Sequence, residues 1–90
     1  MTVKTLGVIG AGQMGNGIAQ VAAASSYDVY LYDINKEALD KGMATITKSC
    51  DRLIKKEKLD EKGKQAILDR IQTTTDLHDF KNVDLAVEAA

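Results

Sequence analysis

The chain has 90 residues, of which 44% are hydrophobic and 28% charged, and its net charge is −1. This composition is typical of one small globular domain with a modest core. The near-neutral charge gives no reason to expect a nucleic-acid partner. No apolar run is long enough to span a membrane, and the single cysteine excludes an internal disulfide. We therefore expect a cytoplasmic protein without a membrane partner.

The first predicted element is a buried strand that leads directly into a glycine-rich turn. Thr5–Ile9 carries apolar residues on both faces, as central parallel strands do. The pattern Gly-x-Gly-x-x-Gly follows at Gly10, Gly12 and Gly15. In such a turn the first glycine permits a sharp bend, the second lets the backbone approach a pyrophosphate, and the third permits close helix packing. The anion would lie on free N–H groups at the positive end of the next helix.

A helix from about Gly12 to Ala24 and a second strand from about Asp28 to Asp33 are predicted next. The predicted apolar face of the helix is Met14, Ile18, Val21 and Ala22. Asp33 lies 18 residues beyond the last glycine, and the dinucleotide fingerprint requires an acidic residue about 20 residues on. A carboxylate there would accept hydrogen bonds from the adenosine ribose and repel a 2′-phosphate. We therefore predict NAD rather than NADP as cofactor; the alternative is a glycine-rich turn without a ligand.

A helical hairpin is predicted between the second strand and the third. Asn35 and Asp60 are suited to cap its two helices, and the first helix is expected to end near Lys56. The predicted buried positions are Leu39, Met43, Ile46, Cys50 and Leu53 in the first helix and Ala66, Ile67 and Ile71 in the second. A parallel crossover needs only one helix of about a dozen residues, so this insertion is expected to carry a function or a partner surface.

Positive charge collects on this hairpin. Nine Lys and Arg stand against six Asp and Glu between residues 36 and 64, and the tightest cluster is Lys55–Lys58. A solvated helix surface and a binding surface for a polyphosphate ligand both fit this pattern. The charges alone do not choose between these two interpretations.

The last part of the chain contains two weaker strand signals around a turn. Ile71–Thr74 has mild strand character, and Asp76 is suited to cap a short turn in which Phe80 is expected to anchor the core. A final strand through Glu88 is predicted by alternating Val83, Leu85 and Val87. We expect His78 to be a surface residue, and we find no metal-ligand cluster. The predicted fold is α/β, the first half of a Rossmann-type parallel sheet with the hairpin inserted between strand 2 and strand 3.

The stretch Val8–Gln20 closely resembles the 3-hydroxyacyl-CoA dehydrogenase family, and within it the bacterial 3-hydroxybutyryl-CoA dehydrogenases. The continuation Gly17-Ile18-Ala19-Gln20 is more specific than the glycine pattern. Tyr32-Asp33, Leu53–Lys56 and Asp84–Ala90 also match the family in order and spacing. The resemblance therefore covers essentially the whole chain.

This resemblance implies an NAD-linked oxidoreductase that interconverts (S)-3-hydroxybutyryl-CoA and acetoacetyl-CoA in fatty-acid and butyrate metabolism. It implies that residues 1–90 are a truncated N-terminal NAD-binding domain, that the C-terminal helical dimerisation domain is absent, and that the full-length enzyme is a homo-oligomer. The catalytic histidine and glutamate of the family lie beyond this chain. We therefore assign no catalytic residue and expect the chain alone to be inactive.

The resemblance also implies individual binding residues. The implied NAD-binding residues are Gly10, Ala11, Gly12, Gln13, Met14, Gly15, Asp33 and Ala89. Ser49 and Lys56 are the implied contacts to the coenzyme A of an acyl-CoA substrate. Three alternatives remain open: the dehydrogenase part of a multifunctional fatty-acid oxidation protein, a separate nucleotide-binding module, and an assembly unit that associates through an exposed sheet edge.

Overall fold

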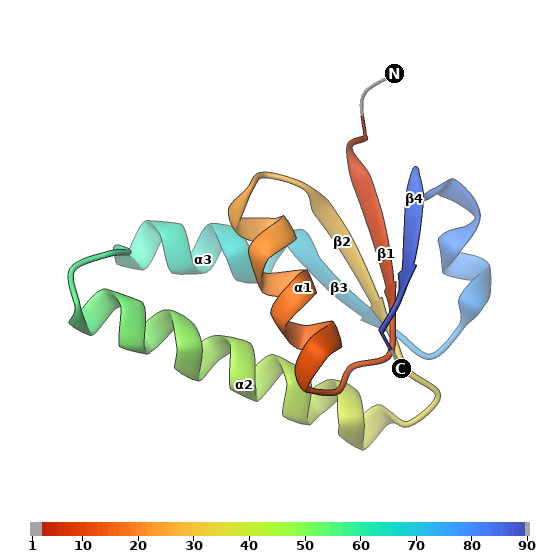
Figure 1. Ribbon diagram of the computed structural model, residues 1–90, viewed down its shortest axis with the longest axis horizontal. Helices are drawn as coiled ribbons and strands as arrows, with labels where there is room; N and C mark the ends of the chain where they lie inside the picture. Colours follow the sequence, from red (N-terminus) through yellow and green to blue (C-terminus); the bar gives the residue numbers. More distant parts are fainter. Residues whose placement is uncertain (1–2, 90) are drawn as a thin grey trace.

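The chain forms a four-stranded parallel sheet, seen in Figure 1 of the computed structural model. The structure describes residues 3–89, so Met1, Thr2 and Ala90, at the ends of the predicted domain, lie outside the described residues. The strands are β1 (Thr5–Ile9), β2 (Asp28–Tyr32), β3 (Ile71–Thr74) and β4 (Leu85–Glu88). Their order is β3-β2-β1-β4, and every pair is parallel. The predicted Rossmann-type sheet with a central first strand is confirmed.

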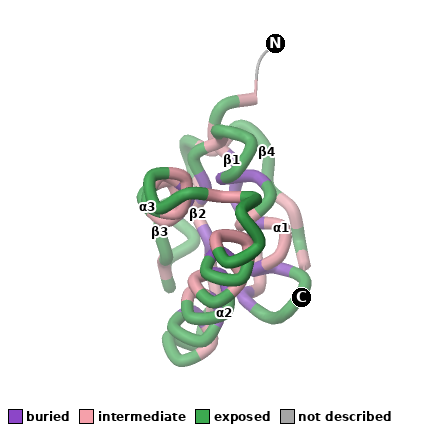
Figure 2. The backbone as a smooth tube through the Cα atoms, turned by 90° about the vertical axis from the view of Figure 1, so that its left-hand side faces the viewer, coloured by how far each residue is buried: buried purple, intermediate pink, exposed green. Residues whose placement is uncertain are grey.

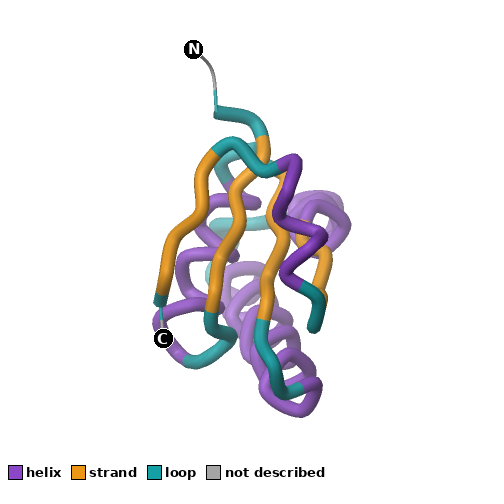
Figure 3. The backbone as a smooth tube through the Cα atoms, turned by 90° about the vertical axis from the view of Figure 1, so that its right-hand side faces the viewer, coloured by secondary structure: helices purple, strands orange, loops and turns teal. Residues whose placement is uncertain are grey.

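The helices lie on both faces of this sheet, but unequally. They are α1 (Gln13–Ala24), α2 (Lys36–Lys55), α3 (Glu61–Arg70) and the short 3₁₀ helix η1 (Leu77–Asn82). Figure 3 shows α1, α2 and α3 behind the sheet and η1 in front of it. The predicted hairpin is α2 and α3, between β2 and β3. Within the described part of the chain, no helix combines the length and apolarity that crossing a membrane requires.

The predicted helix caps are confirmed. The side-chain oxygen of Asn35 accepts a hydrogen bond from the Glu37 N–H at 2.8 Å, which begins α2. Asp60 accepts one from the Gly63 N–H at 2.7 Å at the start of α3. Asp76 accepts one from the His78 N–H at 2.9 Å at the start of η1. These side chains satisfy N–H groups that the first helical turn leaves without a partner.

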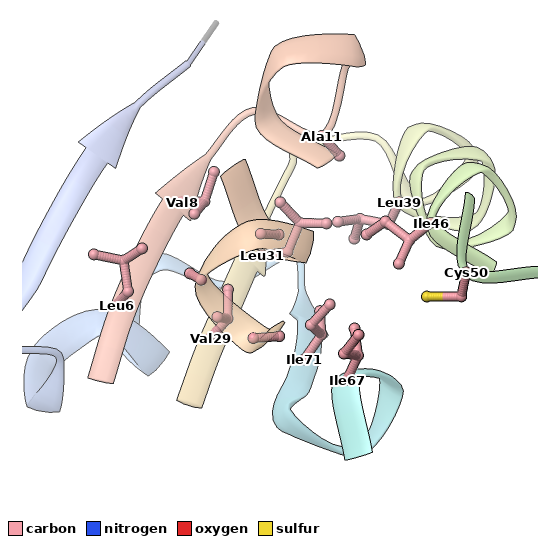
Figure 4. Packing of buried hydrophobic residues seen from close by; sticks show 13 residues of the cluster. Leu6, Val8, Ala11, Val29, Leu31, Leu39, Ile46, Cys50, Ile67 and Ile71 are labelled. Carbon is pink, nitrogen blue, oxygen red and sulfur yellow. The ribbon is translucent and has the colours of Figure 1, made fainter. Parts of the chain in front are cut away.

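The hydrophobic core lies between the sheet and α1, α2 and α3 (Figure 4). The sheet contributes alternate residues of β1 and β2 and the first residue of β3, because only one side of a strand faces these helices. The core residues are Leu6, Val8, Ala11, Ala19, Ala22, Ala23, Val29, Leu31, Leu39, Ile46, Cys50, Ile67 and Ile71. Cys50 was predicted to be a core residue, and its burial raises the pKa of the thiol. Figure 2 shows the largely exposed outer surface of the hairpin.

The predicted apolar face of α1 is confirmed at Ala22, which is buried, and at Ile18, which packs against the core, but it was wrong at Met14 and Val21. Met14 and Val21 are both 67% exposed. The residues that α1 buries are smaller: Gly15, Asn16, Ala19, Ala22 and Ala23. Small residues let a helix approach a sheet more closely than Met or Val would permit, so the close packing of α1 overrides the pattern of large apolar side chains.

Two predictions about the last third of the chain also need correction. Phe80 does not belong to the core cluster; it lies half-buried on the opposite face, where a Cβ on Gly7 would come within 2.7 Å of its ring. The ring also makes an edge contact with Tyr32, at 6.1 Å between centroids. Ile71 begins β3, so the predicted strand Ile71–Thr74 is confirmed and its placement on the second helix of the hairpin was wrong, although it is buried as predicted.

Candidate functional site

The residues that follow the strands meet at one edge of the sheet. Because all four strands are parallel and in register, their carboxyl ends lie together, which is where ligands bind in open α/β sheets. Gly10 follows β1 and donates its N–H to the Tyr32 carbonyl at 2.7 Å. Ala89 follows β4 and donates to the Ile9 carbonyl at 2.8 Å. The structure thus brings the glycine turn and Ala89 together at this edge.

The three glycines of the turn have different surroundings. Gly10 has φ 104°, a backbone conformation that side-chain-bearing residues rarely adopt. A Cβ on Gly15 would lie 1.6 Å from the Gly10 carbonyl oxygen, so α1 can meet the end of β1 only if this residue is glycine. A Cβ on Gly12 would meet nothing within 4 Å. The fold therefore requires glycine at the first and third positions, whereas the open space at Gly12 is available to a ligand.

The first turn of α1 presents backbone N–H groups to this space. Gly12 is the N-cap residue and supplies no capping side chain, and Gln13 and Met14 are exposed. The first N–H groups of a helix have no partner within the helix and lie at the positive end of its dipole. This arrangement fits a pyrophosphate, which needs N–H donors and a backbone without a Cβ in the way.

Asp33 lies beside the glycine turn, one residue beyond the end of β2. One of its carboxylate oxygens accepts the Ala11 N–H at 3.0 Å and the other accepts the Asn35 N–H at 2.9 Å. These hydrogen bonds, with that from Ala11 the largest cause, hold the pKa of Asp33 below its ordinary value. The carboxylate is therefore ionised at neutral pH and holds the turn to the end of β2.

Ser49 and Lys56 lie apart from this edge, on the hairpin. The Ser49 hydroxyl accepts a hydrogen bond from the Gln20 side-chain amide at 2.9 Å, which joins α2 to α1. Lys56 is the exposed C-cap residue of α2, at the end that points away from the carboxyl ends of the strands in Figure 1. An ion pair of 2.7 Å between Lys64 and Asp51 joins α3 to α2.

His78 is exposed on η1, and its ring lies 2.9 Å from the Asp76 carboxylate, as expected of a surface histidine. Among residues 3–89, no three His, Cys, Asp or Glu side chains lie close enough together to hold a metal ion. The carboxyl edge of the sheet thus has the geometry of a dinucleotide-binding site. Among residues 3–89, no histidine lies at this edge, because His78 is on η1.

Two residues near the site, Ile34 and Asn16, are not among those that the sequence patterns indicated. Ile34 directly follows Asp33 and is 83% exposed, an unusual place for a large apolar side chain. The sequence did carry a signal for Ile34, because a large apolar residue directly follows the acidic residue Asp33. Asn16 is buried in α1, only 8% exposed, and lines an open cavity beside Gly12. Nothing in the residue pattern distinguishes this asparagine from one on a helix surface.

A family model, a curated relative and a solved structure all point to the same family. The model of the 3-hydroxyacyl-CoA dehydrogenase NAD binding domain matches residues 5–90. A probable 3-hydroxybutyryl-CoA dehydrogenase of Deinococcus radiodurans is 54% identical over 83 residues, which are 92% of this chain and 30% of that protein. The crystal structure of an (S)-3-hydroxybutyryl-CoA dehydrogenase from Ralstonia eutropha superimposes with a TM-score of 0.96 at 48% identity, covering 99% of this chain and 31% of the other.

These comparisons confirm the predicted family and cofactor, since the matching model is an NAD-binding domain. A further relative, the 3-hydroxybutyryl-CoA dehydrogenase of Bradyrhizobium diazoefficiens, is 46% identical over 98% of this chain but is matched over only 30% of its own length. The chain therefore spans about a third of the length of the curated relatives it matches.

We expect Gly15→Ala to disrupt the domain, because the new methyl group would overlap the Gly10 carbonyl. The expected loss of unfolding free energy is about 3 kcal/mol, a large part of the stability of a small domain. Gly17→Ala is the matched control, since its methyl group meets nothing within 4 Å and should stabilise the helix by about 1 kcal/mol. Urea denaturation measures both; equal stability of the two variants would contradict the close contact.

The stability that Asp33 provides should depend on pH. Because its folded-state pKa is lowered, its contribution is fully present above its ordinary value of 3.8 and is lost as the pH falls through the folded-state pKa. Asp33→Asn should therefore be less stable than the wild type at pH 7, and the difference should shrink below about pH 4. Urea titrations at several pH values measure it, and a difference that stays constant into acid would argue against the two hydrogen bonds.

Proposed function

Because this chain belongs to the 3-hydroxyacyl-CoA dehydrogenase family, as its NAD-binding domain, we propose that it serves an enzyme that interconverts (S)-3-hydroxybutyryl-CoA and acetoacetyl-CoA. The observation that carries the proposal is the glycine turn beside Asp33 at the carboxyl edge of the sheet. Bound NAD would supply the hydride acceptor. The described residues hold and orient that cofactor.

The proposed cofactor contacts follow the geometry of the edge. The N–H groups of Gln13 and Met14 donate to the pyrophosphate, and Gly12 leaves room for it. Asp33 accepts from the adenosine ribose hydroxyls, for which it has lone pairs left beside its two backbone bonds. Ile34 offers an exposed apolar surface to the adenine. Ala89, at the end of β4, presents backbone to the cofactor on the far side of the turn.

The ionised Asp33 also determines which dinucleotide binds. A 2′-phosphate would place a second negative group against the carboxylate, so NADP should bind more weakly than NAD. The carboxylate cannot turn away easily, because both of its oxygens accept backbone hydrogen bonds.

The substrate contribution of this chain is proposed to lie on the hairpin. Ser49 on α2 and Lys56 at its C-cap are seven positions, or about two helical turns, apart and would contact the coenzyme A portion of an acyl-CoA. The lysine-rich end of α2 supports this, because phosphate groups would find ammonium groups there. The acid–base residues of the reaction are proposed to lie outside residues 1–90, since His78 faces solvent on η1.

We further propose that the full-length protein is a cytoplasmic homo-oligomer that binds neither nucleic acid nor membranes. For residues 3–89 themselves, self-association through the β4 edge is supported by exposed apolar residues. Leu85 on this strand is 50% exposed, and Met14 and Val21 on α1 are 67% exposed. An unpaired strand and an apolar surface of this kind favour association.

Gly12→Ala separates a binding role from a structural role. The methyl group would meet no protein atom within 4 Å, so the variant should fold, with a loss of about 1 kcal/mol because alanine is a poorer N-cap than glycine. It would occupy the space proposed for the pyrophosphate, so NADH should bind at least about tenfold more weakly. The rise in melting temperature with added NADH measures the binding. A variant that is stabilised by NADH as strongly as the wild type would overturn the proposed position of the pyrophosphate.

A further inference from the structure

The short helix η1 lies on the face of the sheet opposite α1, α2 and α3 (Figure 3). Its residue Phe80 is half-buried, although the other residues of η1 are exposed. A Cβ on Gly7 would lie 2.7 and 2.8 Å from two carbon atoms of the Phe80 ring. The ring therefore lies directly against the backbone of β1, at a position that only glycine leaves open. This contact fixes η1 to the central strand of the sheet.

The same ring contacts the end of β2. The centroids of the Phe80 and Tyr32 rings are 6.1 Å apart and their planes meet at 76°, which is the edge-to-face arrangement that aromatic pairs prefer. Tyr32 is the last residue of β2 and directly precedes Asp33. Its carbonyl accepts the Gly10 N–H at 2.7 Å. Tyr32 thus connects η1 with the glycine turn and with Asp33.

A second set of contacts joins η1 to the backbone of Asp33. The Asp33 N–H donates to the Thr74 carbonyl at 3.2 Å, at the end of β3. The Thr74 hydroxyl accepts the Asp76 N–H at 3.0 Å and donates to the Asp79 carboxylate. Asp76 is the N-cap of η1 and Asp79 lies in its first turn. The helix η1 therefore braces the backbone of Asp33 through β3 as well as through β2.

We propose that Phe80 is a positioning residue for the dinucleotide, because its contact with Tyr32 keeps the Asp33 carboxylate beside the glycine turn. The inference rests on the proposed function and extends it to a residue on the other face of the sheet. The carboxylate accepts the Ala11 N–H at 3.0 Å, a distance that requires the end of β2 to keep its place beside the turn. Without the ring, the end of β2 can shift and the carboxylate can turn away from the ribose. Loss of the ring should therefore weaken NAD binding and reduce the discrimination against NADP.

The experiment compares Phe80→Leu with the wild type in two measurements. The first is the pKa of the Asp33 carboxyl group, followed by NMR titration of the chain without ligand. This pKa should rise toward its ordinary value of 3.8 in the variant, because weaker backbone hydrogen bonds lower it less. The second is the affinity for NADH and for NADPH. NADH should bind about threefold more weakly, within the range of one aromatic pair, and the ratio of the two affinities should fall.

Three further variants separate positioning from a merely structural role. Phe80→Tyr keeps the ring and should restore both the Asp33 pKa and the affinity ratio. Leu77→Ala is the matched control, because Leu77 is an apolar residue of η1 that is 50% exposed, and it should change neither quantity. If Phe80→Leu does not fold, Tyr32→Leu removes the other ring of the pair and should have the same two effects.

A folded Phe80→Leu chain with the Asp33 pKa and the affinity ratio of the wild type would overturn the inference while the cofactor site stands. Equal effects of Leu77→Ala and Phe80→Leu would also overturn it, because any disturbance of η1 would then suffice. A wild-type chain that binds neither dinucleotide would refute the proposed function instead. In that case the Asp33 pKa alone decides whether Phe80 positions this carboxylate.

Discussion

The architecture depends on the contact between Gly15 and the carbonyl of Gly10. The absence of a side chain at Gly15 lets α1 begin directly at the end of β1, where a methyl group would overlap the Gly10 oxygen at 1.6 Å. This contact determines where the N–H groups at the start of α1 lie. Asp33 adds the second constraint, because its carboxylate binds the Ala11 N–H and holds the turn to the end of β2.

Close packing of α1 has consequences across the domain. The face of α1 toward the sheet consists of small residues, so larger apolar side chains such as Met14 and Val21 lie outside, where they form an exposed surface. Close packing also extends to α2, where a Cβ on Gly42 would come 3.0 Å from the Ala11 carbonyl. The hairpin is therefore held against the same turn that is proposed to bind the cofactor. The surface proposed for the dinucleotide and the surface proposed for an acyl-CoA are therefore neighbours.

Local chemistry determines which features could be predicted from the sequence. The four strands, the glycine turn and the caps at Asn35, Asp60 and Asp76 depend on neighbouring residues, and all were predicted. The buried face of α1 and the position of Phe80 depend on how closely distant elements approach, which periodicity does not report. The burial of Asn16 could not be predicted for the same reason, since only the fold shows that this residue is 8% exposed. The roles of Ser49, Lys56 and Ala89 come from family resemblance and stay predictions.

The central claim is that these residues form a preorganised site for NAD, with Asp33 as the group that selects it over NADP. Calorimetric titration of NAD⁺ and NADP⁺ into the wild-type chain and into Asp33→Asn tests this claim most directly. We expect NAD⁺ to bind the wild type, NADP⁺ to bind it much more weakly, and Asp33→Asn to weaken NAD⁺ binding and to reduce the difference in affinity between the two dinucleotides. A cooperatively folded wild-type chain that binds no NAD⁺, or that binds both dinucleotides equally, would contradict it.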